Sequence, residues 1–276
     1  MANPHPAPGR PNRAAPPRID GPSLARAFTD GATALREQAD ALNAINVFPV
    51  PDGDTGTNMS LTMRAAIEQI DGASSLADAA RRAARGALIG AKGNSGVILS
   101  QIIAGFASAM PATDGLSSGD LARALDRGRE AAYRVVSAPK EGTILTAISA
   151  AAEAAGRAPS SDAAVETLES VVAAAQEAVA RTPELLPVLK EAGVVDAGAQ
   201  GLYVLLDAML RSLRGDAPPP RDERLGHIDA GWLAATERAH DAHGGQSGFC
   251  TEFVASGDGL DVDPIRSRLL ELGDSV

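Results

Sequence analysis

Apolar residues recur at three- and four-residue spacing almost without a break from Ser23 to Gly215. This spacing places them on one face of a helix, and few β-branched runs alternate as they would in a strand. Because the intervening loops are mostly short, the helices should run antiparallel in an all-α bundle or barrel. The pattern predicts eight helices, near residues 23–44, 57–71, 75–91, 95–110, 118–136, 142–156, 161–181 and 197–214, and a short turn near 184–192.

Residues with capping preferences support several of these boundaries. Hydroxyl and carboxylate side chains can accept hydrogen bonds from the first helical N–H groups, and glycine tolerates the backbone that ends a helix. Ser23 is expected to open the first helix and Ser118 or Asp120 the fifth. Helix ends are expected at Gly72, Gly115 and Gly156.

The flanking segments differ in composition from the helical part. Residues 1–22 are predicted to be a disordered tail, since six prolines fall within the first 18 positions. The helical domain is expected to span 23–214, and the proline-rich segment after it predicts a linker over 215–247.

The last part of the chain, 248–276, has the pattern of an α/β unit. Residues 248–255 alternate like a strand, and 264–272 favour a helix with Pro264 in its first turn. One strand and one helix cannot bury their own apolar faces. We therefore expect this segment to be the start of an incomplete α/β middle domain, in a chain shortened from something longer.

Composition excludes several classes of protein. A net charge of -10 and 3% aromatic residues argue against a nucleic-acid-binding protein, which needs a basic surface. No segment is apolar for long enough to predict a membrane span. The single cysteine, Cys250, excludes an intrachain disulfide framework and fits the reducing cytoplasm. Its residue type favours a small buried side chain.

The loop before the second predicted helix carries two carboxylates and an amide, at Asp52, Asp54 and Asn46. A calcium EF-hand loop starting at Asp52 would need an acidic or amide residue where Gly56 stands and a glutamate where Met63 stands, so that interpretation fails. Two or three oxygen ligands suit Mg²⁺, which substrate phosphates and water complete. The alternative is an acidic surface turn.

A glycine-rich loop, Gly90-Ala-Lys-Gly-Asn-Ser-Gly96, precedes the fourth predicted helix. Glycines at a helix N-terminus allow backbone N–H groups to face an anion. The loop is not a Walker A motif, because Lys92 is followed by glycine and not by serine or threonine. The alternative is a tight turn with Ser95 as the N-cap.

Two further polar clusters begin helices, at Lys140-Glu-Gly-Thr143 and at Asp196-Ala-Gly198. Each could be ordinary capping by Thr143 or Asp196. In an antiparallel arrangement, however, alternate helix N-termini share one end of the bundle. We therefore expect the four loops to converge on one polyanion.

Four motifs in this order, NVFPVPDGDTGTNM, GAKGNSGVILSQ, KEGTILT and LPVLKEAGVVDAGAQGL, resemble the DhaL-type nucleotide-binding domain shared by dihydroxyacetone kinases and the bacterial fatty acid kinase A subunit. The resemblance covers residues 23–215. The later stretches GFCTEFV and LLELGDSV resemble the start of the middle domain in the fatty acid kinase branch.

The resemblance implies an eight-helix barrel that binds ATP or ADP at one end through two Mg²⁺ ions. Asp52 and Asp54 would bridge the ions, with Asn46 near the place of a third ligand, and Thr55 stands where dihydroxyacetone kinases have histidine. No catalytic residue is implied beyond the metal and phosphate ligands. The nucleotide would be contacted by Thr55, Gly56, Thr57, Asn58, Asn94, Ser95, Gly96, Thr143, Arg181, Asp196 and Gly198.

The implied reaction transfers the γ-phosphate of ATP to a fatty acid carboxylate, giving an acyl phosphate. A lipid-binding partner subunit would present the fatty acid, and a homodimer is compatible with the resemblance. Two alternatives stay open: a dihydroxyacetone kinase subunit, and a non-catalytic nucleotide-binding module.

Overall fold

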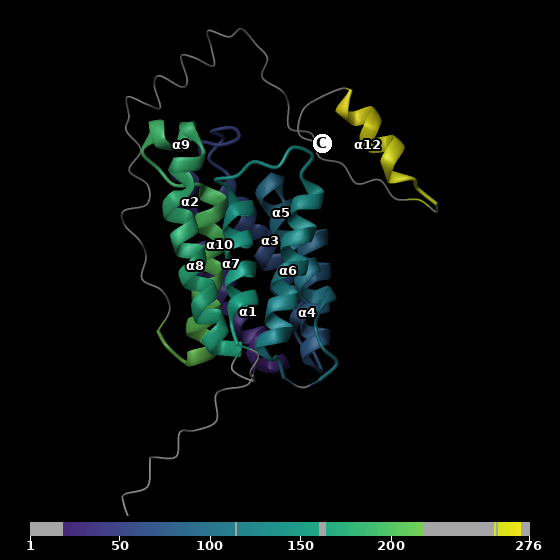
Figure 1. Cartoon of the computed structure of the whole chain (residues 1–276). Coiled ribbons are helices and arrows are strands. Elements are labelled where there is room, and N and C mark those ends of the chain that lie inside the picture. Colours follow the sequence, from purple (N-terminus) through teal and green to yellow (C-terminus); the bar gives the residue numbers. More distant parts are fainter. Residues whose placement is uncertain (1–18, 114, 160–163, 218–256, 258, 272–276) are drawn as a thin grey trace, which may run out of the picture.

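The computed structural model describes residues 19–113, 115–159, 164–217, 257 and 259–271. These residues form a helical barrel with one further short helix near its upper end (Figure 1). The described ranges contain no strand, and extended backbone pairs only at an isolated bridge between Ile19 and Leu116. The predicted all-α fold is confirmed.

Eight of the described helices are long and build the barrel. They are α1 (Gly21–Glu37), α3 (Thr55–Ile70), α4 (Leu76–Ile89), α5 (Gly93–Ser108), α6 (Ser118–Val135), α7 (Ile144–Arg157), α8 (Ala164–Leu185) and α10 (Ala197–Arg214). Shorter helices are α2 (Ala39–Ala44), α9 (Pro187–Ala192) and α12 (Val262–Leu270).

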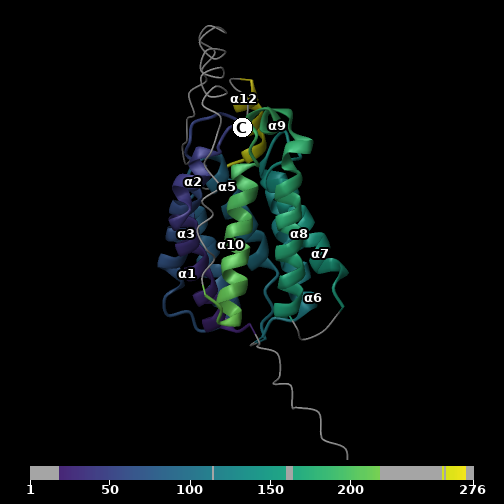
Figure 2. The ribbon, with the colours of Figure 1, turned by 90° about the vertical axis from the view of Figure 1, so that its left-hand side faces the viewer.

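The long helices form a closed antiparallel ring. Each packs against the next long helix in the chain, and α10 packs against both α8 and α1. Figure 2 shows α10 between α1 and α8 after a quarter turn of the molecule. As a result the N-termini of α3, α5, α7 and α10 lie at the end of the barrel where α9 is found (Figure 1).

Two predicted elements differ from the structure. The helix expected over 23–44 is interrupted at Gln38, where α1 ends and α2 begins. Gly56 of α3 lies against this break, since a Cβ at Gly56 would stand 2.2 Å from the Ala39 carbonyl oxygen. The turn expected near 184–192 contains the end of α8 and the short helix α9.

Several predicted helix boundaries were wrong by a few residues. Asp20 is the N-cap of α1, and Ser23 completes a capping box at the third helical position. The barrel thus includes residues 19–22, which the sequence placed in the tail. Likewise Ser117 caps α6, with Asp120 as its capping-box partner. Gly156 lies inside α7 and does not end it.

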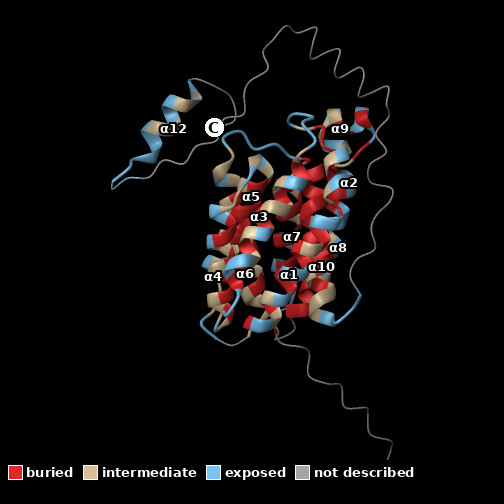
Figure 3. Cartoon of the chain, turned by 180° about the vertical axis from the view of Figure 1, so that it is seen from behind, coloured by how far each residue is buried: buried red, intermediate tan, exposed pale blue. Residues whose placement is uncertain are grey.

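The core is one continuous apolar cluster inside the ring, rich in alanine and leucine. Figure 3 shows the buried residues on the inward faces of the helices and the exposed ones outside. Glycine allows close helix contacts: a Cβ at Gly86 would lie 2.2 Å from the Ala65 carbonyl oxygen, and one at Gly105 would lie 2.2 Å from the Arg127 carbonyl oxygen. These contacts offset the helical cost of glycine.

Of the C-terminal segment, the structure describes α12 and a few residues before it. The expected helix over 264–272 is present as Val262–Leu270, capped by Asp261, with Pro264 in its first turn. Arg266 of α12 donates to the Val135 carbonyl at the end of α6, 3.4 Å away. The predicted strand over 248–255 and most of the 215–247 linker lie outside the described residues. Among the helices of the described part, none combines the length and apolar character needed to span a membrane.

Candidate functional site

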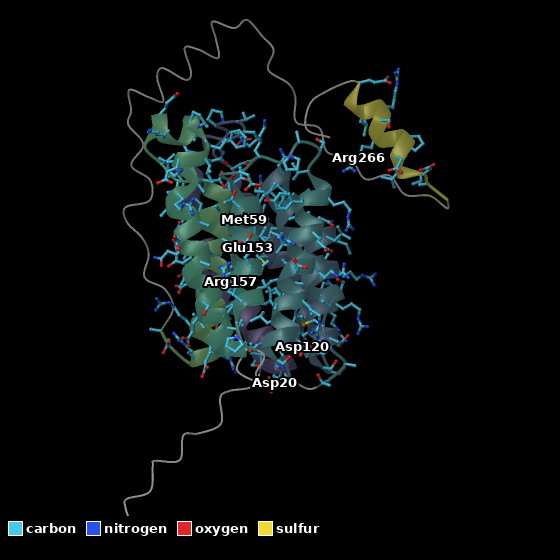
Figure 4. All side chains as sticks on the ribbon, in the orientation of Figure 1. Asp20, Met59, Asp120, Glu153, Arg157 and Arg266 are labelled. Atoms are coloured by element: carbon cyan, nitrogen blue, oxygen red, sulfur yellow. The ribbon has the colours of Figure 1, made fainter. Side chains whose placement is uncertain are left out.

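Four polar loops meet at the α9 end of the barrel, which we name the N-terminal pole. It comprises the loops 45–54, 90–92, 136–143 and 193–196, which precede α3, α5, α7 and α10. Figure 4 shows that Asp20 and Asp120, which begin α1 and α6, lie at the opposite end. The structure therefore places the four loops at one end, as the sequence predicted.

The first loop is anchored by apolar residues and carries two carboxylates. Ile45 and Val47 are buried in a small cluster with residues of α9 and the start of α10. Farther along, Asp52 is exposed and Asp54 is partly buried. Asp54 occupies the N-cap position of α3, yet its side chain makes no capping hydrogen bond. Its carboxylate is therefore not committed to the helix.

The two carboxylates of this loop, Asp52 and Asp54, repel each other. Partial burial raises the pKa of Asp52, and the charge of Asp54 and a hydrogen bond to it raise that pKa further. Over the described ranges, no group of three or more His, Cys, Asp and Glu side chains could hold a metal ion. The pair thus provides acidic oxygens without a complete metal cage.

The glycine-rich loop lies directly against α3. A Cβ at Gly93, whose φ is +58°, would stand 2.2 Å from Nδ2 of Asn58, and one at Gly96 would stand 2.4 Å from Oγ1 of Thr62. The backbone N–H of Lys92 donates to the same Thr62 hydroxyl at 3.3 Å. The start of α5 therefore lies against Asn58 and Thr62 of α3.

The alternative role of Ser95 as N-cap is wrong. Lys92 holds the N-cap position of α5, and no side chain there accepts a capping hydrogen bond. Asn94 is exposed and Ser95 is partly exposed. The N-cap side chain therefore does not occupy the start of α5, and an anion at a helix N-terminus would lie there.

Asp196 joins two helix N-termini. Its Oδ2 accepts from the Ala199 N–H of α10 at 2.8 Å, and its carboxylate also accepts from the N–H groups of Gly198 and Ile144, the first residue of α7. Its own N–H donates to Oγ1 of Thr182 at 3.0 Å. Burial raises the pKa of Asp196 to about 7, while the N–H donors lower it.

These contacts bear on the predicted roles of Thr143 and Asp196. Thr143 is the N-cap of α7 and accepts from the Leu145 N–H at 3.3 Å. Asp196 is only 5% exposed. Capping by both residues is confirmed, and the Asp196 carboxylate points into the protein. The neighbouring Gly198 also lies against α7, since a Cβ there would stand 3.4 Å from the Ile144 side chain.

A groove of about 800 Å³ lies between α7 and α8, lined by Arg157, Glu166, Glu177 and several alanines. Arg157 is the last residue of α7, whose N-terminus is at the pole. The groove is therefore displaced from the predicted site residues.

Comparison with known proteins identifies the family. A model of the DAK2 domain matches residues 49–211, more than half of the chain. The chain belongs to the DAK2 domain family. Similar curated proteins include uncharacterized proteins of Staphylococcus aureus strains USA300 and NCTC 8325, each 36% identical over 272 residues, which cover 94% of this chain and 49% of the relative. The chain thus spans about half the length of these relatives.

A solved structure with a similar fold is a dihydroxyacetone kinase from C. freundii in complex with AMP-PNP and Mg²⁺. The similarity has a TM-score of 0.51 and 18% identity, and it covers 77% of this chain and 38% of that one. At 18% identity this similarity shows only that the DAK2 domain of this chain has the same fold as part of that protein.

Asn46 of the DAK2 domain braces the acidic loop. Its Oδ1 accepts from the Thr55 N–H at 2.9 Å, its Nδ2 donates to the Val50 carbonyl at 2.9 Å, and the residue is 5% exposed. Both ends of the amide are used within the loop. The structure therefore gives no support to Asn46 as a third metal ligand.

Sequence analysis missed one residue that contacts the proposed site. Asn43, in α2, donates from Nδ2 to Oγ1 of Thr57 at 2.9 Å and accepts from the Thr57 N–H at 3.1 Å. It therefore fixes a side chain that the sequence assigned to phosphate contact. An amide in a short helix twelve residues before α3 carries no local signal, although Asn43 and Asn46 are closely spaced.

Arg181 lies near the pole through its place in α8. It precedes Thr182, whose hydroxyl accepts from Asp196. The guanidinium is exposed and pairs with Glu184 at 3.7 Å. Such an exposed pair is weak, so a phosphate could replace it.

Proposed function

We propose that the N-terminal pole binds ATP together with Mg²⁺ and is the nucleotide site of a phosphotransferase. The observation that carries this proposal is that the start of α5 lies against Asn58 of α3, the helix that Asp52 and Asp54 precede, and that neither helix is capped by its N-cap side chain. One side offers acidic oxygens for a cation and the other offers N–H groups for an anion. A metal-bound polyphosphate needs both.

The donor chemistry at the pole fits Mg²⁺. Carboxylate oxygens are the ligands this ion prefers, and few protein ligands are typical because phosphates and water complete its shell. Asp52 and Asp54 would hold the ion, or two ions as the sequence resemblance implies. When bound, Mg²⁺ supplies neutralisation of the phosphate charge during transfer. A bound cation would also relieve the repulsion that raises the pKa of Asp52.

In this proposal the remaining residues contact different parts of the nucleotide. Thr57, Asn58, Asn94 and Ser95 contact the phosphates, with Arg181 as a further cation. Thr143 and Gly198 line the nucleotide from the α7–α10 side. Thr55, Gly56 and Gly96 act mainly through the backbone, since they are buried, and Asp196 acts by holding α7 and α10.

For the acceptor we propose the carboxylate of a fatty acid, presented by a lipid-binding partner subunit in the cytoplasm. A fatty carboxylate is ionised near neutral pH, so its phosphorylation requires no general base. Thr55 stands where the resemblance expects histidine in dihydroxyacetone kinases, whose acceptor is a hydroxyl group. The backbone N–H of Thr55 donates to Asn46, and its buried position keeps it from replacing such a base.

Titration of the full chain with ADP, with and without Mg²⁺, tests the nucleotide site. We expect binding that depends on Mg²⁺ and is lost in Asp52→Ala and Asp54→Ala, while Asp71→Asn at the far end of α3 leaves it unchanged. Retention of Mg-ADP binding in both alanine variants would exclude the assignment.

Measuring ATP consumption with each candidate acceptor then distinguishes between the proposed reactions. With a fatty acid and its binding subunit, the proposal predicts an acyl phosphate; dihydroxyacetone alone should give no turnover. Turnover with dihydroxyacetone would favour the dihydroxyacetone kinase alternative. Nucleotide binding without turnover for any acceptor would favour a non-catalytic module.

A further inference from the structure

A cluster of four side chains connects α6, the third polar loop and α7. Tyr133 donates its hydroxyl to Oε1 of Glu141 at 2.7 Å, and Thr146 donates to Oε2 of the same carboxylate at 2.5 Å. Ser149 donates to the Tyr133 hydroxyl at 3.1 Å. We name these residues, Tyr133, Glu141, Thr146 and Ser149, the hydroxyl–carboxylate cluster.

Glu141 differs from other glutamates of the barrel in its partners. Glu130, Glu153 and Glu184 each form an ion pair with an arginine three or four residues away. Within the described part of the chain, Glu141 has hydroxyl partners and no ion pair. Hydroxyl donors fix the direction of a carboxylate and leave its charge in place. The cluster therefore orients Glu141 toward the α6–α7 interface.

The turn from Lys140 to Thr143 is held from both sides. Thr143 donates its hydroxyl to the Lys140 carbonyl at 2.7 Å, and the Gly142 N–H donates to Oγ1 of Thr146 at 2.7 Å. Gly142 has φ +83°, and a Cβ there would lie 2.9 Å from the side chains of Leu185 and Leu186. Thr146 thus links the backbone of the turn to the Glu141 carboxylate.

Lys140 is the cationic group of this turn. It is exposed and forms no ion pair among the described residues. The chain contains only two other lysines, Lys92 and Lys190, against 25 lysines and arginines together. Both are at the pole, at the start of α5 and in α9. A flexible ammonium group suits a phosphate ligand as a point charge.

We infer that Glu141 and Tyr133 are positioning residues for nucleotide binding, acting through the turn that presents Lys140 to the phosphates. The inference rests on the proposed function. A free Glu141 side chain would repel a polyphosphate from the neighbouring Lys140. Held by two hydroxyls, the same carboxylate fixes the turn and leaves the ammonium as the charge that meets the ligand.

A double-mutant cycle on the full chain tests this inference through the dissociation constant of Mg-ADP. Tyr133→Phe and Glu141→Gln should each weaken binding about three- to tenfold, which is the net effect of losing one ordinary hydrogen bond. Lys140→Ala should also weaken binding. Because Tyr133 acts through the turn, Tyr133→Phe should have no further effect when Lys140 is alanine.

Glu153→Gln is the matched control, since it removes the same charge from an exposed ion pair of α7. It should leave the dissociation constant unchanged. If Tyr133→Phe prevents folding, Thr146→Val tests the same cluster, and it should weaken Mg-ADP binding to a similar extent. Melting temperatures establish that each variant is folded at the temperature of titration.

The inference would be overturned if Tyr133→Phe raised the dissociation constant of Mg-ADP by the same factor in the wild-type chain and in Lys140→Ala. Tighter binding by Glu141→Gln would also overturn it, because Glu141 would then act only as a repelling charge. If the wild-type chain binds no nucleotide, the proposed function fails. Amide hydrogen exchange tests the fixed turn without nucleotide: unchanged exchange at residues 142–145 in both cluster variants would overturn the inference on its own ground, and faster exchange would support the part of it that concerns the turn.

Discussion

Gly93 lies so close to Asn58 that a Cβ at Gly93 would stand 2.2 Å from the side-chain Nδ2 of Asn58. This relationship joins the start of α5 to the first turns of α3, where the acidic loop ends. Gly93 also has φ +58°, a backbone conformation that residues with a side chain seldom adopt. Any side chain at this position would therefore disturb both the helix start and its neighbour.

Gly93→Ala should destabilise the fold and weaken nucleotide binding. The left-handed backbone alone costs about 1–2 kcal/mol for alanine, and displacement of Asn58 removes a proposed phosphate contact. We expect a melting temperature several degrees lower and a dissociation constant for Mg-ADP at least tenfold higher. Gly156→Ala is the control, because Gly156 lies in α7 with no atom within 4 Å of an added Cβ. It should stabilise the helix by about 0.5–1 kcal/mol. Unchanged binding in Gly93→Ala would refute the contact.

Asp196→Asn should alter how stability depends on pH. The pKa of Asp196 is raised to about 7 by burial, whereas an unfolded aspartate releases its proton near its ordinary value of 3.8. Between these values the folded state holds more protons than the unfolded state, so rising pH favours unfolding. The free energy of unfolding of the wild type should fall across this window relative to the asparagine variant, by at most about 1.4 kcal/mol per pH unit. Denaturant titrations from pH 4 to pH 8 measure the difference; a constant difference across the range would contradict the prediction.

The long helices could be predicted from sequence because each buries one face in a common core, and that face repeats every 3.6 residues. The interruption at Gln38 could not, since it accompanies the approach of Gly56 to the Ala39 carbonyl, a contact between separate elements. Capping errors have a related cause. Ser23 and Asp120 have the expected residue types, yet they serve as third residues of capping boxes that begin at Asp20 and Ser117.

The polar loops of the site were also visible in the sequence, since their composition is local. Their partners were not. Asn43 is joined to Thr57 by two hydrogen bonds, and Asp196 caps α7 as well as its own helix. Both relationships depend on which helices are neighbours in the closed ring. Motif spacing therefore located the loops, and the fold was needed to distinguish bracing residues from candidate ligands.

Asp52→Asn should weaken ligand binding without lowering the stability of the fold. In the absence of a cation, Asp54 and partial burial raise the pKa of Asp52, so removal of its charge should leave the melting temperature unchanged or slightly higher. Binding of Mg-ADP should fall at least tenfold, since one acidic ligand is lost. Asp71→Asn should change neither quantity. A lower melting temperature with intact binding would indicate a structural role for Asp52 and contradict its assignment.

Asn46→Asp distinguishes a brace from a metal ligand. If Asn46 were a ligand, a carboxylate would strengthen Mg²⁺ binding. Because its amide instead donates to the Val50 carbonyl in a buried position, the aspartate would lose that donor and place a charge beside a carbonyl oxygen. We expect destabilisation of about 2 kcal/mol or more, with no gain in affinity for Mg²⁺ measured by titration. Gln176→Glu, the same chemical change at an exposed position of α8, should leave stability within about 0.5 kcal/mol. Tighter Mg²⁺ binding at unchanged stability in Asn46→Asp would restore Asn46 to the ligand set.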